Sequence, residues 1–107
     1  MEELDYIYEN YICDYDHDLT LKIGSFFDKS NKVYATEKHV KNQMASYFMT
    51  NFKIWHSLPS QDSMNKYTNK NINYVLISND NSLEIHILVY RGKVVRVKAW
   101  HLTEKNT

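Results

Sequence analysis

The chain has 107 residues, 43% of them hydrophobic, and its 13 basic and 13 acidic side chains leave a formal net charge of zero. That length suits one domain, spanning residues 1–107, and the hydrophobic content argues against a chain that is disordered over most of its length. The lone cysteine, Cys13, excludes an intramolecular disulfide framework and indicates a reducing compartment, while the absence of a leader peptide or a long apolar run predicts a soluble, cytoplasmic protein without a membrane partner.

Charge is divided unevenly along this neutral chain. Residues 1–18 hold seven acidic and no basic side chains, which leaves thirteen basic and six acidic side chains, or +7, for the rest. We therefore expect an acidic N-terminal arm over 1–18 and a basic body over 19–107. Apolar residues at helical spacing predict an amphipathic helix over 2–13, namely Leu4, Ile7, Tyr8, Tyr11 and Ile12.

Residues 19–27 fit two kinds of structure. Leu19, Leu21 and Ile23 alternate with polar residues, which favours a strand. The spacing of Leu19, Ile23 and the pair Phe26-Phe27 also fits a helix. The strand is our prediction, followed by a turn at 28–31 and a return strand at 32–35, so this segment adds a short β-hairpin to the expected fold.

The next segment predicts one long core helix from Thr36 to Ser57. Thr36 suits the N-cap position, and Leu58-Pro59 stops the helical pattern. The apolar face of this helix consists of Val40, Met44, Tyr47, Phe48, Phe52 and Trp55. Residues 60–71 are polar and aperiodic, so we expect a surface loop there.

The C-terminal third predicts three antiparallel strands, at 73–78, 83–90 and 93–101, because it is rich in β-branched residues. A two-residue turn at Arg91-Gly92 would place charged side chains opposite Ile85 and Ile87, so we reject it. A three-residue loop from Tyr90 to Gly92, with Gly92 at positive φ, is preferred. The expected pairs are Leu83–Ala99, Ile85–Val97 and Ile87–Val95 on one face, and Glu84–Lys98, His86–Arg96 and Leu88–Val94 on the other.

The predicted class is therefore α+β, with the long core helix packed on the apolar face of a three-stranded antiparallel sheet. The other face of that sheet is expected to point to solvent or to a partner. It should carry Glu84, His86, Arg96, Lys98 and Trp100.

The sequence predicts no cofactor, no metal site and no catalytic residue. Three aspartates alternate over 14–18 like the start of a calcium loop, but Leu19 and Ser25 stand where that loop needs glycine and glutamate. Cys13 and His17 are four residues apart, but the neighbouring acids raise the pKa of a thiol and oppose a reactive thiolate. The histidines lack zinc-ligand spacing, and the two glycines are too distant for a phosphate-binding loop.

Two surfaces carry side chains suited to partner contacts. The acidic arm contributes Tyr6, Asp14, Tyr15, Asp16 and Asp18. The C-terminal sheet contributes His86, Tyr90, Arg91, Lys93, Arg96, Lys98 and Trp100. Tyr, Trp and Arg concentrate binding energy at protein interfaces, and the same mixture of cations and rings grips single-stranded nucleic acid.

We therefore predict a small non-enzymatic binding protein that acts on a partner macromolecule, as a regulator, inhibitor or immunity-type protein does, with a protein as the expected partner. The residue bias is typical of an AT-rich genome, such as that of a bacterium or its phage. The first alternative is a nucleic-acid-binding protein that uses the C-terminal sheet, against which overall neutrality argues. The second is a cone-shaped ligand-binding or enzymatic domain with a pocket between helix and sheet.

Overall fold

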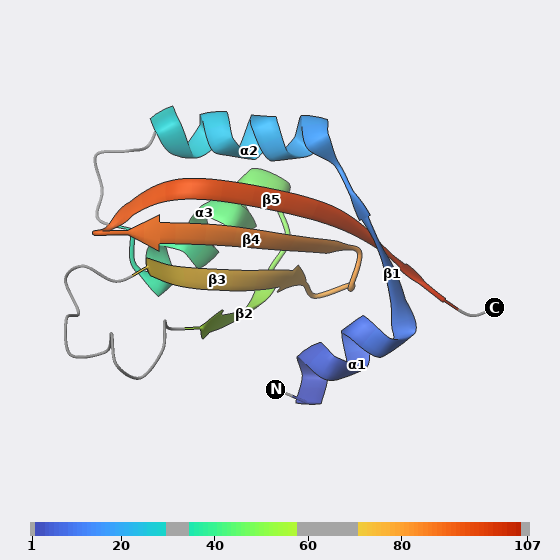
Figure 1. Ribbon diagram of the computed structural model, residues 1–107. Coiled ribbons are helices and arrows are strands. Elements are labelled where there is room, and N and C mark those ends of the chain that lie inside the picture. The colour runs from blue at the N-terminus through green and yellow to red at the C-terminus, as the bar shows by residue number, and fades with distance from the viewer. Residues whose placement is uncertain (1, 30–34, 58–70, 106–107) are drawn as a thin grey trace.

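The computed structural model describes residues 2–29, 35–57 and 71–105, and within these ranges it contains three helices and five strands (Figure 1). In chain order they are α1 (Glu2–Asn10), β1 (Tyr11–Tyr15), α2 (His17–Lys29), α3 (Glu37–Phe48), β2 (Phe52–Ser57), β3 (Asn71–Ser78), β4 (Leu83–Tyr90) and β5 (Lys93–Glu104). The strands form one antiparallel sheet in the order β1-β5-β4-β3-β2. The α+β class is confirmed, but the sheet is larger than the predicted three strands.

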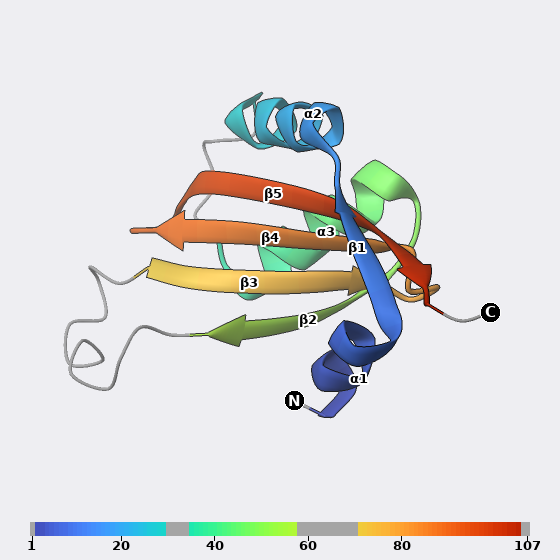
Figure 2. The same ribbon diagram turned by 45° about the vertical axis from the view of Figure 1, so that its right-hand side comes forward.

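Different helices cover the two faces of the sheet. Helices α2 and α3 pack on one face, where Ile23, Met44, Leu76 and Ile85 belong to the main core. Helix α1 packs on one end of the opposite face through Leu4 and Ile7, which form a smaller cluster with Val75, Ile77 and Leu102. Figure 2 shows α1 beside the end of the sheet where β1 crosses β5, while α3 lies behind the strands. No helix in the described ranges is both long enough and apolar enough to cross a bilayer.

The N-terminal helix is shorter than predicted, because residues 11–15 form an edge strand rather than its last turn. Helix α1 ends at Asn10, whose side-chain amide donates to the Tyr6 carbonyl over 2.8 Å. Strand β1 then pairs with β5, with Cys13 opposite Leu102 and Tyr15 opposite Trp100. The edge of β5 offers backbone groups that need partners, and satisfying them outweighs the helical spacing of Tyr11 and Ile12.

The strand predicted at 19–27 is wrong, since these residues lie in α2. Asp16 caps this helix, with its Oδ1 accepting from the Leu19 amide over 2.9 Å. Ile23 and Phe27, four residues apart, are buried against the sheet, so the helical spacing is the one that the core uses. The return strand expected at 32–35 falls on residues 32–34, which are outside the described residues, and on Ala35, which is buried but not in a strand.

The long core helix is also shorter than predicted. Thr36 caps α3 as expected, accepting from the His39 amide over 3.2 Å, but the helix ends at Phe48 because Met49 adopts the left-handed conformation, with φ 56°. Phe52 and Trp55, which we had expected on the helix, lie on β2 opposite Ser78 and Val75 of β3. The expected loop at 60–71 lies outside the described residues, except for Asn71, which begins β3.

The last three strands are confirmed, but the predicted register of the β4–β5 hairpin is wrong. Arg91 and Gly92 both have positive φ, 53° and 78°, and Tyr90 pairs with Lys93, so the connection is the two-residue turn that we rejected. Between the pairs Leu88–Arg96 and Val89–Val94, β5 contains one extra residue, Val95. This bulge shifts the strand by one position and lets Ile85 face Ala99 and Ile87 face Val97 instead of charged side chains.

Candidate binding face of the sheet

The sheet face opposite α2 and α3 is left open where α1 does not cover it. Directly paired residues share a face, and the observed pairs are Tyr15 with Trp100, His86 with Lys98, and Leu88 with Arg96. Residues two apart on one strand also share a face, which links Trp100, Lys98 and Arg96 along β5. We call the side chains of Tyr15, His86, Arg96, Lys98 and Trp100 the open face.

Three rings of the open face lie side by side across three strands. The Trp100 ring centroid lies 4.5 Å from that of His86 on β4 and 5.8 Å from that of Tyr15 on β1. Tyr15 remains 50% exposed. The sequence had assigned Tyr15 to a separate acidic surface, so the pairing of β1 with β5 joins members of two predicted surfaces into one.

Exposed cations continue the open face along β5. Arg96 and Lys98 are exposed, and Lys93 lies further along the same strand. At the hairpin tip the Arg91 Cζ lies 5.2 Å from the centroid of the Tyr90 ring, within the range of a cation–π contact. Among the described residues, no carboxylate forms an ion pair with any of these four cations. Their positive charge is therefore directed to solvent.

Glu84, which we had expected to point to solvent, is 2% exposed beneath α1 and next to the open face. Its Oε2 accepts the Tyr8 hydroxyl over 2.8 Å and lies 2.8 Å from His86 Nε2, while the Cys13 thiol donates to Oε1 over 3.7 Å. Burial opposes the charged carboxylate, but the hydrogen bonds from His86 and Tyr8 outweigh burial and hold the pKa of Glu84 below its ordinary value. Glu84 is thus a buried, hydrogen-bonded carboxylate, not a solvent-exposed one.

The environment of Glu84 makes the neighbouring thiol of Cys13 and hydroxyl of Tyr8 poor nucleophiles, because it raises their pKa values. Burial, followed by the Glu84 charge and hydrogen bond, raises the pKa of the Cys13 thiol. Burial and the same carboxylate raise the pKa of the Tyr8 hydroxyl far above its ordinary value. The thiol and the phenol therefore act here as hydrogen-bond donors, a role that the sequence did not reveal for either residue.

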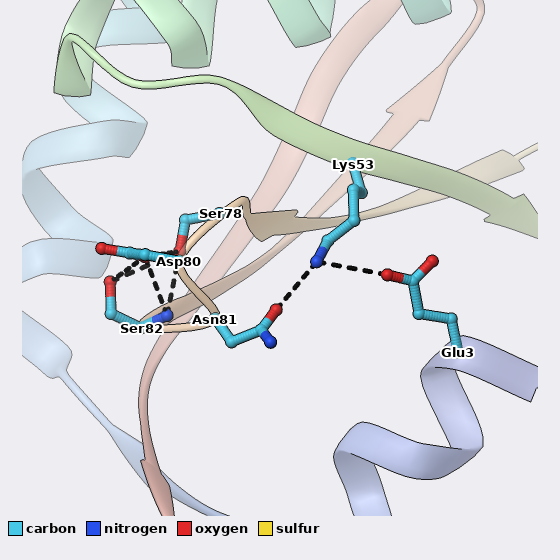
Figure 3. A network of polar contacts seen from close by, with 6 residues as sticks. All are labelled: Glu3, Lys53, Ser78, Asp80, Asn81 and Ser82. Atoms are coloured by element: carbon cyan, nitrogen blue, oxygen red, sulfur yellow. Dashed lines mark hydrogen bonds and ion pairs between the residues drawn. The ribbon is translucent and has the colours of Figure 1, made fainter.

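A second polar network holds α1 against the β3–β4 turn (Figure 3). Lys53 Nζ on β2 lies 3.2 Å from Glu3 Oε2 on α1 and donates to Asn81 Oδ1 in the turn over 2.8 Å. The turn is closed by Asp80 Oδ1, which accepts from the hydroxyls of Ser78 and Ser82. These contacts, together with Tyr8 and Glu84, fix which part of the sheet face α1 covers.

The remaining arm candidates do not belong to the open face. Asp14 pairs with His101 on β1–β5, and Asp16 caps α2 while its Oδ2 lies 2.7 Å from His101 Nε2. The hydrogen bond from the Leu19 amide, then that from His101, lowers the pKa of Asp16. Asp18 lies in the first turn of α2, and Tyr6 is exposed on α1. Asp14 and Asp16 flank Tyr15 in the chain, but their observed partner is His101 and not a member of the open face.

The described residues form open grooves on the helix side of the sheet. A groove of about 290 Å³ runs between α2 and β5 past Thr20, Gly24 and Val95, and a groove of about 410 Å³ lies beside Lys22, Phe26 and Tyr47. Among the described residues, no group of three or more His, Cys, Asp or Glu side chains could hold a metal ion. We take the open face, where three rings lie together beside Lys98 and Arg96, as the candidate site.

Comparisons of this chain with models of protein families, with curated proteins and with solved structures found no match. The open face is accordingly interpreted from its own chemistry.

Proposed function

We propose that this chain is a non-enzymatic binding protein that acts on a partner macromolecule through the open face. The observation that supports this proposal most strongly is the placement of Tyr15 and His86 on either side of Trp100, next to Lys98 and Arg96. Aromatic rings and arginine are the side chains that contribute most at interfaces. Strands of one sheet hold these groups, so little backbone entropy is lost when a partner binds.

The cations on and beside the open face favour a partner with a negative surface. Lys93, Arg96 and Lys98 have no ion-pair partner among the described residues, while the Glu84 carboxylate is buried and hydrogen-bonded. A macromolecule with a negative surface therefore gains attraction at the open face, both in affinity and in association rate. The protein would act by covering such a surface, as a regulator, inhibitor or immunity-type protein does, and the single cysteine suits action in the reducing cytoplasm.

A paired-variant capture experiment tests the proposal. The protein and its Arg96→Glu/Lys98→Glu variant are each immobilised and incubated with the same bacterial lysate, and bound protein and nucleic acid are quantified. A Lys38→Glu/Lys41→Glu variant changes net charge equally on the exposed side of α3, away from the open face. We expect bound material that is lost with the open-face variant and retained with the α3 variant. Equal capture by all three proteins would contradict the proposal.

A further inference from the structure

We infer that the partner of the open face is single-stranded nucleic acid, an inference that rests on the proposed binding function and names its partner class. The overall neutrality of the chain argues against nucleic acid only if acidic and basic side chains are mixed on the surface. In the structure the open face carries cations, while the acids of residues 1–18 occupy other positions. They lie on α1, on β1 at Asp14, which is paired with His101, at the β1–α2 junction and in the first turn of α2.

The ring arrangement supplies a place for unpaired bases. Tyr15, Trp100 and His86 follow one another across β1, β5 and β4 at centroid separations of 5.8 and 4.5 Å. Single-stranded nucleic acid is held when bases stack on aromatic side chains mounted on a sheet, and this stacking tolerates any sequence because every base has a π face. A duplex keeps its base faces covered, so these rings favour a single strand over a double one.

The cations lie where a phosphate backbone would follow those bases. Trp100, Lys98 and Arg96 alternate along β5, and two residues of a strand span about 7 Å. The row of rings runs across the strands and the row of cations runs along β5, and the two rows meet at Trp100 and Lys98. Lys93 and Arg91 extend the positive row to the hairpin tip.

Helix α1 limits the site at its other end. It carries Glu3, Asp5 and Glu9, and it packs over Glu84 through Tyr8. A polyanion is repelled by this helix and attracted by β5, so the bound strand is confined to the uncovered part of the sheet. An acidic protein would meet the same charges, but it carries no regular row of bases to stack on the three rings.

Tryptophan fluorescence gives a direct test with defined probes. The chain has two tryptophans, so a Trp55→Phe variant leaves Trp100 as the reporter. Short oligothymidylate, oligouridylate, a duplex of matched length and polyglutamate are each titrated into this full-length variant over a range of salt concentrations. We expect both single strands to quench Trp100, with weaker quenching by the duplex and none by polyglutamate.

Variants then assign the contacts. Each phosphate contacted by a cation adds about −0.7 to the slope of log affinity against log salt for single strands, so Arg96→Glu/Lys98→Glu should flatten that slope by about 1.4. Trp100→Ala should weaken binding of a labelled oligothymidylate roughly fivefold or more, because one stacked base is lost. Lys38→Glu/Lys41→Glu should leave both the slope and the affinity unchanged.

The outcomes separate this inference from the proposed function. Binding of polyglutamate but not of the oligonucleotides, with loss in the Arg96→Glu/Lys98→Glu variant, would overturn the nucleic-acid inference and keep a binding face for an acidic protein. Oligonucleotide binding that Trp100→Ala leaves unchanged would also overturn it, since the rings would then take no part. If no probe binds and lysate capture does not depend on the open face, both proposals are wrong.

Discussion

The Tyr8 hydroxyl donates a 2.8 Å hydrogen bond to Glu84 Oε2, which joins the N-terminal helix to β4 across 76 residues of sequence. Leu4 and Ile7 of the same helix bury their side chains in the cluster with Ile77 and Leu102. Apolar packing holds α1 on the sheet, and the buried carboxylate fixes its position there. The same carboxylate contacts His86, so Glu84 links helix α1 to the open face.

Removal of the Tyr8 hydroxyl tests this anchor. Hydrogen bonds to charged groups contribute about 1.5–3 kcal/mol, and partial exposure of Tyr8 reduces that contribution, so Tyr8→Phe should lower the free energy of unfolding by about 1–2 kcal/mol. Tyr6→Phe is the matched control, because Tyr6 lies on the same helix and is 54% exposed. Urea denaturation of both variants measures the difference, and equal effects would contradict an anchoring role for Tyr8.

Glu84 also predicts how stability depends on pH. Its pKa in the folded protein is lowered, whereas the pKa of an unfolded glutamate is about 4.3. The carboxylate therefore contributes stability that is present above about pH 4.3 and lost as pH falls through the lower folded-state pKa. In Glu84→Gln the loss of stability below about pH 4.3 should be smaller, while Asp16 and Asp80, whose pKa values are also lowered, keep part of it. Identical pH profiles would show that Glu84 is not tuned in this way.

Cys13 should react slowly with a disulfide reagent although its residue is exposed. Burial of the thiol and the Glu84 charge raise its pKa, so less thiolate is present near the ordinary thiol pKa of about 8.5 than in an unfolded chain. The rate of modification by a chromogenic disulfide should be below that of the urea-unfolded protein. Glu84→Gln should increase the rate in the folded state, and a rate that does not respond to this substitution would contradict the assigned cause.

The fold was predictable where local pattern and tertiary structure agree. The β-branched residues of β3, β4 and β5 identify these strands, and Thr36 identifies the start of α3. The ends of α1 and α3 were not predictable, because apolar residues continue the helical spacing into β1 and β2. Helix α3 ends because Met49 adopts the left-handed conformation, for which methionine has no preference. Residues 11–15 form β1 because they pair with the edge of β5, nearly ninety residues away in the sequence.

The open face was predictable only in part. Strand alternation alone identifies His86, Arg96, Lys98 and Trp100 as neighbours on one face. The addition of Tyr15 depends on the pairing of β1 with β5, and the burial of Glu84 depends on where α1 docks, so neither follows from local sequence. A lone glutamate between aliphatic residues of β4 is the one signal that could have indicated a buried, partnered carboxylate.

The main core predicts a large effect at Met44. This side chain is completely buried on α3 against the sheet, so Met44→Ala should lower the free energy of unfolding by about 2–5 kcal/mol. Ser46→Ala, two residues away on an exposed position of the same helix, should change it by less than about 0.5 kcal/mol. Thermal and urea denaturation of the pair check the phase of α3, and a larger effect at Ser46 would mean that the phase is wrong.

The turn between β4 and β5 predicts opposite effects at its two residues. Positive φ costs an ordinary residue about 1–2 kcal/mol, so Gly92→Val should destabilise the protein by at least about 1 kcal/mol. Arg91 already bears that cost, and asparagine is preferred at this position of a two-residue turn, so Arg91→Asn should relieve it. The substitution also removes the contact of Arg91 with the Tyr90 ring, worth about 0.5–1 kcal/mol at an exposed site, which leaves a net gain of up to about 1 kcal/mol.

A Tyr90→Leu background separates the relief of positive φ at Arg91 from the loss of the cation–π contact, because that contact is then absent before Arg91 is changed. In that background Arg91→Asn should raise the free energy of unfolding by more than it does in the native sequence. The excess measures the Arg91–Tyr90 contact, as in any double-mutant cycle. If Arg91→Asn destabilises the protein in both backgrounds, the positive φ of Arg91 carries no cost that asparagine relieves, and the prediction is wrong.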